Sequence, residues 1–138
     1  MFSQDWTLCR DLITDIKKQF PNTYIVAGGE HITSMYEYSL RDCDSLDCCV
    51  LGEGEDTIVE LVEAKKSNKV LGNIPGLAYR VADEIRVNPQ RTRIRGVSKI
   101  PWPEWGLFPL NAYFNADMQF GVGDGISIPM LASRGCPY

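Results

Sequence analysis

The sequence predicts an α/β fold with parallel strands, and three observations predict it. Two short apolar segments, residues 23–29 (TYIVAGG) and 47–55 (DCCVLGEGE), both lead into glycines. Amphipathic segments with helical spacing precede, separate and follow these two segments. The alternation of helix, strand, helix, strand and helix is typical of chains that wind around a parallel sheet.

The first helix is predicted over residues 3–20. Ser3 is a suitable N-cap, and apolar residues recur at helical spacing as far as Phe20, before Pro21 ends the pattern. Residues 23–29 then predict a strand that is buried on both faces, because the run is apolar and rich in β-branched residues.

A second helix is predicted over residues 34–42, with Ser34 as its N-cap and Tyr36 and Leu40 facing inward. The second strand follows in residues 47–55 and repeats the order of apolar residues, glycine and acid. Two buried strands need neighbours on both sides. We therefore expect further strands from upstream of Met1 or from a partner chain, with self-association into a homo-oligomer as one outcome.

The third helix is predicted over residues 55–67. Ile58, Leu61 and Val62 share one face, and acidic residues gather near its start, where the helix dipole favours them.

The pattern changes after Ser67. Alternating apolar residues around a turn at 82–84 predict a β-hairpin within residues 77–87. Residues 100–110 (IPWPEWGLFPL) contain three prolines and two tryptophans, which predicts an extended connector rather than a helix or a strand. One more strand is predicted over residues 126–133 (ISIPMLAS).

Composition excludes several classes of function. The 138 residues are 44% hydrophobic and 23% charged, with a net charge of −4, which fits one ordinary globular domain. A basic stripe for nucleic acid is missing, no apolar run reaches the length of a membrane span, and the first residues do not resemble a signal peptide. We expect a cytoplasmic protein that binds no nucleic acid and has no membrane span.

The chain has five cysteines and no C-x-x-C pair. Cys9, Cys48 and Cys49 are expected to be buried, reduced thiols, whereas Cys43 lies in a polar connection and is expected at the surface. Cys136 lies two residues before the end of the sequence. It is either a tail thiol or the first ligand of a metal site.

Glycines at the ends of the two strands are candidates for ligand binding. The carboxyl ends of parallel strands border the ligand crevice of α/β sheets, and glycine lets a ligand approach the backbone closely. Neither turn has a dinucleotide-binding or P-loop motif, so tight turns without a ligand remain the alternative. His31 follows the first turn and is expected to be a capping or loop residue rather than a ligand.

Five short motifs occur in a fixed order: IVAGGEHIT, CCVLGEGEDTIVELVE, IPGLAYR, IPWPEWGLFPL and PMLASRGCPY. In this order and spacing the chain closely resembles the cobalamin-dependent radical S-adenosylmethionine enzymes, especially the group with anaerobic magnesium-protoporphyrin monomethyl ester cyclases. The resemblance begins at about Leu12 and covers nearly all of the remaining chain.

The resemblance implies a partial flavodoxin-like (Rossmann-like) parallel sheet with flanking helices, followed by the hairpin and an extended linker. Residues 1–70 would be the C-terminal part of a cobalamin-binding domain. Residues 71–138 would be the hairpin and the linker, rich in proline and tryptophan, that ends at the start of the radical domain. The D-x-H-x-x-G motif that supplies a histidine to cobalt in some such domains is absent, and His31 is not given that role.

The resemblance also implies roles for individual residues. Gly28, Gly29 and Thr33 would line the nucleotide-loop side of cobalamin, and Gly52, Glu53 and Gly54 would form the neighbouring wall. Cys136 would be the first of three cysteines that hold a 4Fe–4S cluster, with the other two beyond Tyr138. This chain alone is therefore expected to assemble no cluster and to have no radical activity.

The implied function is that of the cobalamin-binding region of a radical S-adenosylmethionine enzyme. The parent enzyme would perform radical methyl transfer or oxidative cyclisation on a small-molecule substrate, with cobalamin, a 4Fe–4S cluster and S-adenosylmethionine as cofactors. One alternative is a radical enzyme whose Rossmann-like domain does not bind cobalamin. The other is a stand-alone protein-interaction module that uses the segment with Trp102 and Trp105.

Overall fold

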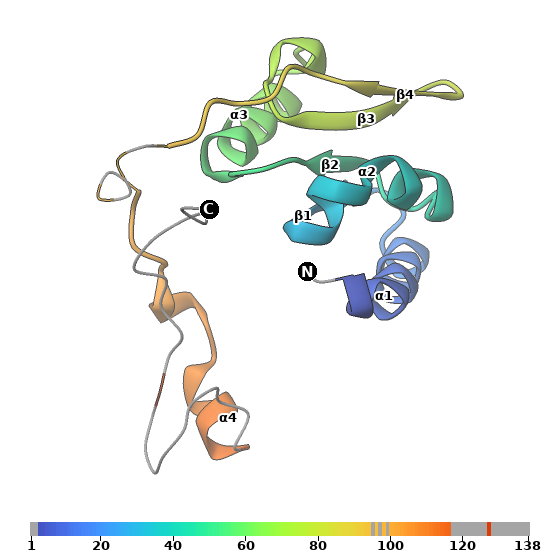
Figure 1. The fold of residues 1–138 in the computed structure, drawn as a ribbon. Coiled ribbons are helices and arrows are strands. Elements are labelled where there is room, and N and C mark those ends of the chain that lie inside the picture. Colours follow the sequence, from blue (N-terminus) through green and yellow to red (C-terminus); the bar gives the residue numbers. More distant parts are fainter. Residues whose placement is uncertain (1–2, 95, 97, 99, 117–126, 128–138) are drawn as a thin grey trace. The chain divides into compact units, whose positions relative to one another are not determined.

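The chain divides into two compact units, Met1–Ile94 and Arg95–Tyr138 (Figure 1). The computed structural model describes residues 3–94, 96, 98, 100–116 and 127. Each unit is considered by itself.

The first unit contains one four-stranded sheet whose strands lie in the order of the sequence, β1-β2-β3-β4. The strands are β1 (Val26–Gly28), β2 (Cys48–Val50), β3 (Leu77–Val81) and β4 (Glu84–Val87). β1 and β2 are parallel, as predicted, and Gly28 lies opposite Val50. β3 is antiparallel to β2 and to β4. The α/β, Rossmann-like fold is thus confirmed, and the predicted hairpin extends the same sheet and makes it mixed.

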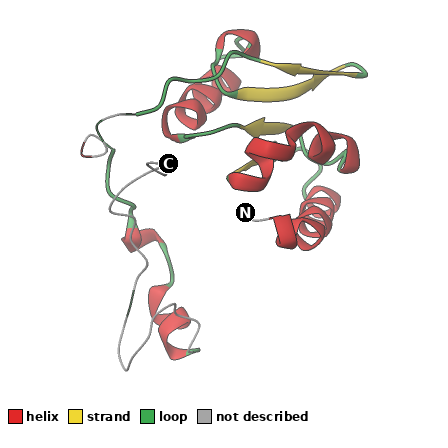
Figure 2. Cartoon of the chain, in the orientation of Figure 1, coloured by secondary structure: helices red, strands yellow, loops and turns green. Residues whose placement is uncertain are grey.

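Three helices cover the sheet on its two faces (Figure 2). They are α1 (Trp6–Gln19), α2 (Glu30–Asp42) and α3 (Glu55–Lys66). Neighbouring strand residues point to opposite faces, so that Cys49 and Ala78 pack with α1 and α2, while Cys48 and Leu77 pack with α3. The first of these two clusters also contains Trp6, Ile13, Ile32, Leu40 and Leu46, and the second contains Val50, Leu61, Ala64, Ile74 and Tyr79.

Two helix predictions need correction. α2 begins at Glu30 rather than Ser34, and Gly29 is its N-cap. The backbone leaves helical geometry at Met35, which separates a first turn from the predicted part of the helix. In α3 the buried residues are Thr57, Leu61 and Ala64, whereas the predicted inward residues Ile58 and Val62 are 40% and 45% exposed.

Cys43 is the third correction, since it is buried rather than exposed. It lies in the connection from α2 to β2, which Arg80 of β3 holds against the sheet. The Arg80 guanidinium donates hydrogen bonds to four backbone carbonyls, those of Leu40, Cys43, Asp44 and Leu46. One side chain thereby satisfies carbonyls at the end of α2 and in the connection that follows it.

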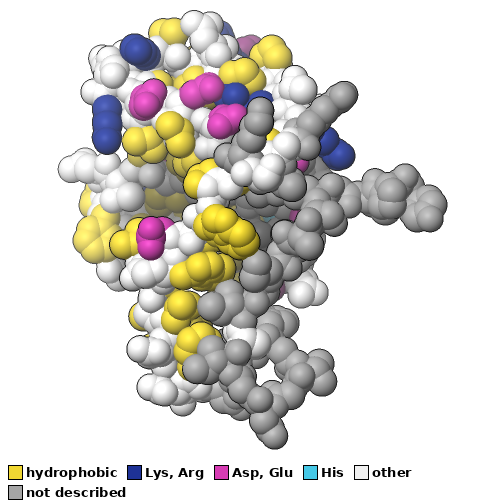
Figure 3. Space-filling view, turned by 90° about the vertical axis from the view of Figure 1, so that its left-hand side faces the viewer, with side chains coloured by type: hydrophobic (Ala, Val, Ile, Leu, Met, Phe, Trp, Pro, Cys, Tyr) yellow, Lys and Arg dark blue, Asp and Glu magenta, His cyan; other side chains and the backbone are white. Residues whose placement is uncertain are grey.

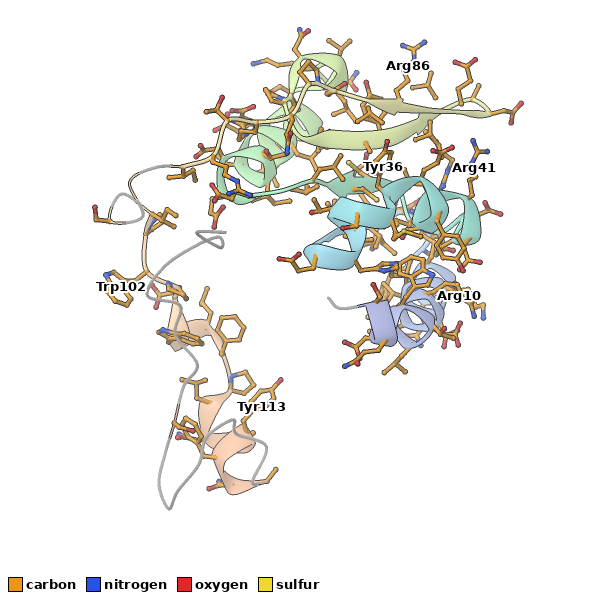
Figure 4. The ribbon with its side chains drawn as sticks, viewed as in Figure 1. Arg10, Tyr36, Arg41, Arg86, Trp102 and Tyr113 are labelled. Carbon is orange, nitrogen blue, oxygen red and sulfur yellow. The ribbon has the colours of Figure 1, made fainter. Side chains whose placement is uncertain are left out.

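The second unit has a 3-10 turn at Trp105–Leu107 and a short helix, α4 (Leu110–Asn115). The 3-10 turn corrects the prediction that residues 100–110 are extended throughout. Trp102 is 77% exposed and projects from its own segment (Figure 4). The strand predicted over residues 126–133 and the candidate ligand Cys136 lie outside the described residues, apart from Ser127.

None of the described helices combines the length and the apolar composition that crossing a bilayer requires.

Candidate functional site

Two glycine turns meet at one edge of the sheet, where β1 and β2 end. The first turn is Gly28-Gly29 and leads into α2, and the second is Gly52-Glu53-Gly54 and leads into α3. Because β1 and β2 are parallel neighbours, both turns lie at the same edge. This juxtaposition is the one that the strand pattern predicted.

Backbone conformation explains a glycine in each turn. Gly29 has a φ of 99° and Gly52 has a φ of 71°, values that residues with a Cβ atom rarely adopt. At Gly29 the chain reverses at once into α2, and the Gly29 carbonyl accepts the N–H of Thr33 at 2.9 Å.

Thr33 joins the two turns. Its Oγ1 accepts a hydrogen bond from the N–H of Gly52 at 3.0 Å, across 19 positions of sequence. The first turn of α2 and the second glycine turn are therefore held together by a side chain that the sequence predicted to line the site.

A hollow of about 420 Å³ lies between the end of β1 and the start of α3. Its walls are mainly apolar and consist of Val26, Ala27, Gly28, Val50, Gly54, Glu55 and Ile58. In the upper part of Figure 3, which shows the first unit from the side on which β1 and β2 end, hydrophobic side chains and acidic side chains lie close together on the surface.

The two glycines of the hollow have different surroundings. A Cβ atom at Gly28 would meet the carbonyl oxygen of Val50 at 3.5 Å, an ordinary contact, so a small side chain there is compatible with the fold. A Cβ atom at Gly54 would lie 3.0 Å from Val50 Cγ1, which is too close without a shift of that side chain. Gly54 therefore allows α3 to pack closely against β2.

The Glu53 carboxylate accepts a hydrogen bond from the backbone of the same chain. Its Oε2 accepts the backbone N–H of Ile94 at 2.6 Å. The sequence predicted Glu53 as part of a ligand wall, but it gave no sign of this contact, because the partner lies 41 positions away.

Arg91 is a cationic side chain that lies close to two acidic side chains of α3. Its guanidinium forms an ion pair with Glu60 at 2.8 Å and lies 4.0 Å from Asp56. Sequence reasoning missed Arg91, since neither its spacing nor its neighbours mark it as a partner of α3.

His31 has a role in packing. The ring stacks on Trp6 with centroids 5.1 Å apart, Nδ1 lies 3.0 Å from Ser3 Oγ, and Nε2 lies 3.2 Å from Ser39 Oγ. Both ring nitrogens therefore have hydroxyl partners, and His31, which was expected as a capping or loop residue, lies buried in the first turn of α2.

The described cysteines form no metal site. Cys9, Cys43, Cys48 and Cys49 are all free, and among the described residues no group of three or more His, Cys, Asp and Glu side chains is arranged to hold a metal ion. Burial raises the pKa of the Cys48 and Cys49 thiols to about 12, so both stay protonated at neutral pH.

Comparison with known families and proteins gives three findings. Residues 1–62 match the family described as "B12 binding domain". The chain is 38% identical over 117 residues to the uncharacterized methyltransferase PH0819 of Pyrococcus horikoshii, a match that covers 85% of this chain and 24% of that protein. It is 34% identical over 121 residues to the anaerobic magnesium-protoporphyrin IX monomethyl ester cyclase of Cereibacter sphaeroides, covering 86% of this chain and 19% of that protein.

Among solved structures, the chain resembles the radical S-adenosylmethionine methyltransferase TsrM from Kitasatospora setae, determined with cobalamin and a 4Fe–4S cluster bound. The TM-score is 0.56 at 25% identity, and the match covers 66% of this chain and 16% of that chain. This chain thus spans about a quarter or less of the proteins that it matches.

Proposed function

Because residues 1–62 belong to the B12-binding domain family, we propose that the edge at which β1 and β2 end binds a corrinoid. The chain as a whole is related to the cobalamin-dependent radical S-adenosylmethionine enzymes, which supports the proposal. The observation that carries the proposal is the hollow of about 420 Å³, which two glycine turns border. Its site residues are Gly28, Gly29, Thr33, Gly52, Glu53 and Gly54.

The residues present fit the chemistry of a corrinoid's nucleotide tail. That tail is a flat aromatic base joined to a ribose and a phosphodiester. Val26, Val50 and Ile58 offer apolar contact to the base, and Gly28 presents backbone without a side chain toward it. The positive end of the α3 dipole, which begins after Gly54, favours the negatively charged phosphodiester.

The polar residues of the two turns act within this proposal by shaping the turns. Thr33 holds Gly52, and the Glu53 carboxylate holds Ile94. In this proposal the backbone of the glycines in both turns contacts the ligand: Gly28, Gly29, Gly52 and Gly54. When bound, the corrinoid supplies a cobalt centre that carries a methyl group or an electron, and this chain's residues hold its tail and keep water from the apolar wall.

The activity of the whole protein follows from its relatives as a proposal. A methyltransferase and a cyclase among the relatives support radical methyl transfer or oxidative ring closure on a small-molecule substrate. Cys136 would be the first thiolate of a 4Fe–4S cluster that also binds S-adenosylmethionine. Residues 1–70 would then serve cobalamin binding, and residues 71–138 would lead to the radical domain, in a cytoplasmic enzyme.

One observation favours a second function for the second unit. Trp102 and Leu107 are 77% and 82% exposed, as in a surface that binds another protein. The relatives match 85% or more of this chain, which favours the enzyme over a stand-alone interaction module.

A titration with hydroxocobalamin, followed by visible absorbance, tests the proposal. We expect a saturable spectral change with weak affinity, because β1 has a neighbouring strand on only one side within the described part of the chain. A spectrum that equals the sum of free protein and free hydroxocobalamin at every concentration would refute corrinoid binding by this chain.

A further inference from the structure

The chain that leaves β4 continues in the direction of that strand, toward the edge of the sheet at which the glycine turns lie. The N–H of Asn88 donates to the Leu77 carbonyl at 2.8 Å, and the Pro89 carbonyl accepts the N–H of Gly76 at 2.9 Å. The Asn88 side-chain amide donates to the carbonyls of Leu71 and Ile74, both at 2.7 Å. We call residues 88–94 the strap, and it is the last segment of the first unit.

Arg91 fastens the strap to the first turns of α3. Its Nε donates to Thr57 Oγ1 at 2.8 Å, and its Nη2 lies 2.8 Å from Glu60 Oε2. The Arg91 side chain is only 17% exposed, whereas that of Glu60 is 43% exposed, so the bond to the buried Thr57 is the better shielded of the two contacts. Thr57 is fully buried and donates its own proton to the Pro75 carbonyl at 3.0 Å, which leaves its oxygen free to accept from Arg91.

Glu53 fastens the end of the strap to the second glycine turn. The bond from the Ile94 N–H to the Glu53 carboxylate is short, at 2.6 Å, and charge-assisted. The attachment lies directly beside Gly54 and Glu55, which line the hollow. The strap therefore bonds to residues that are sequence neighbours of the wall of the hollow at two places, Glu53 beside Gly54 and Thr57 beside Ile58.

We propose that the strap positions the second glycine turn and the first turn of α3, with Glu53 and Arg91 as the positioning residues. Its role in corrinoid binding rests on the function proposed above. Glu53 ties the turn from one side, and Arg91 ties α3 through Thr57 and Glu60 from the other. Turn and helix are thereby held in the arrangement that forms the hollow before a ligand arrives, which lowers the conformational cost of binding.

The charge of Arg91 adds a second effect. Asp56 and Glu60 would otherwise leave uncompensated negative charge on the first half of α3, which would weaken the attraction of the helix start for a phosphodiester. Pairing with Arg91 offsets part of this charge, while Glu55 adds an acidic side chain in the wall of the hollow itself.

The test uses the 138-residue chain and four variants. In Glu53→Ala and Arg91→Ala an attachment is lost. In Glu53→Gln the side-chain oxygen still accepts the Ile94 N–H, and Arg93→Ala removes an exposed arginine of the same strap as a matched control. Hydrogen–deuterium exchange of residues 52–58 and 88–94 is measured first without ligand, and hydroxocobalamin is then titrated.

We expect faster exchange at residues 52–58 in Glu53→Ala and Arg91→Ala, and about tenfold weaker hydroxocobalamin binding, from the loss of one charge-assisted hydrogen bond. Glu53→Gln should restore wild-type exchange at residues 52–58, and Arg93→Ala should leave it unchanged. Unchanged exchange at residues 52–58 in both alanine variants would contradict the proposed positioning role of the strap. An equally large increase in exchange in Arg93→Ala would contradict it as well. If the wild type binds no corrinoid but exchange rises as stated, the positioning role is supported and only the corrinoid proposal fails.

Discussion

The N–H of Gly52 donates to the hydroxyl of Thr33 at 3.0 Å and joins the turn after β2 to the first turn of α2. Each glycine turn alone is a common feature of α/β proteins. Their connection through a side chain makes them one edge of defined shape.

Replacing Thr33 with valine removes this bond while it preserves the shape of the side chain. Because Gly52 is exposed and its N–H can bind water instead, we expect a loss of about 0.5–1 kcal/mol in the free energy of unfolding. Urea denaturation measures this loss, and Thr33→Ser, which retains the hydroxyl, is the control. Equal stability of the valine variant and the wild type would show that the bond does not hold the turns together.

Gly28→Val tests the approach of the ligand to β1. A Cβ atom at Gly28 makes only ordinary contacts, so the fold should persist, while the added methyl groups would occupy space in the hollow. We expect hydroxocobalamin to bind at least about tenfold more weakly, with an unchanged circular dichroism spectrum. Gly72→Ala is the control, since a Cβ atom there meets only the Tyr79 hydroxyl, at 3.6 Å. Equal affinity of Gly28→Val and the wild type would mean that the Gly28-Gly29 turn serves the backbone alone.

Arg80→Met tests how the hairpin is attached to the rest of the first unit. The methionine keeps most of the aliphatic stem but leaves the carbonyls of Leu40, Cys43, Asp44 and Leu46 without the guanidinium. We expect a loss of about 2–3 kcal/mol in the free energy of unfolding, by urea denaturation. Arg86→Met is the matched control, because Arg86 lies on β4 and points away from the sheet (Figure 4). Similar losses in the two variants would contradict a specific role for Arg80.

The buried thiols predict a loss of stability in alkaline solution. Burial raises the pKa of Cys48 and of Cys49 from the ordinary value of 9.0 to about 12. Between these values the unfolded chain releases thiol protons that the folded chain keeps, so unfolding becomes more favourable as the pH rises. We expect stability to be unaffected by these groups below pH 9 and to fall above it, by at most about 1.4 kcal/mol per pH unit and thiol. Urea denaturation at pH 8 and pH 10 measures the fall, which should be smaller in a Cys48→Ala, Cys49→Ala double variant.

The open side of β1 predicts self-association. In the described part of the chain β1 pairs with β2 on one side, and unpaired strand edges favour pairing between molecules. Sedimentation velocity at increasing micromolar concentration should show a growing share of dimer or larger species. A sedimentation coefficient that stays that of a monomer throughout this range would contradict the expectation.

The sequence predicted the parts of this structure that depend on neighbouring residues. The runs YIVAGG and CCVLGEG identified two parallel strands with glycine turns at a common edge, and alternation around Ala82 identified the hairpin. The pairing of β3 with β2 was not predictable, because periodicity shows that a strand exists but not which strand it joins. The structural importance of Arg80 and Arg91 was hidden for the same reason, since their partners lie 31 or more positions away.

Two predictions about helices were wrong, namely the start of α2 and the buried face of α3, and both concern polar side chains. Ser34 matches the composition of an N-cap, but Gly29 already starts α2. Thr57 was left out of the buried face of α3 because it is polar, yet its hydroxyl bonds to Pro75 and Arg91 allow complete burial. Hydrogen-bond partners that are distant in sequence decided the case of Thr57, whereas α2 starts at Gly29 through the local bond from the Thr33 N–H to the Gly29 carbonyl.

The agreement between strand order in the sheet and strand order in the chain has a consequence for folding kinetics. Each strand pairs with the next strand in the sequence, and β3 and β4 are joined by only two residues. Such a hairpin closes in about 1–10 μs, whereas the parallel pairing of β1 with β2 requires α2 to form and to cross between them. The pairing of β2 with β3 likewise requires α3 to cross between them. We therefore expect the hairpin to form before either of these two pairings, so that the edge with Gly28 and Gly52 is completed after it.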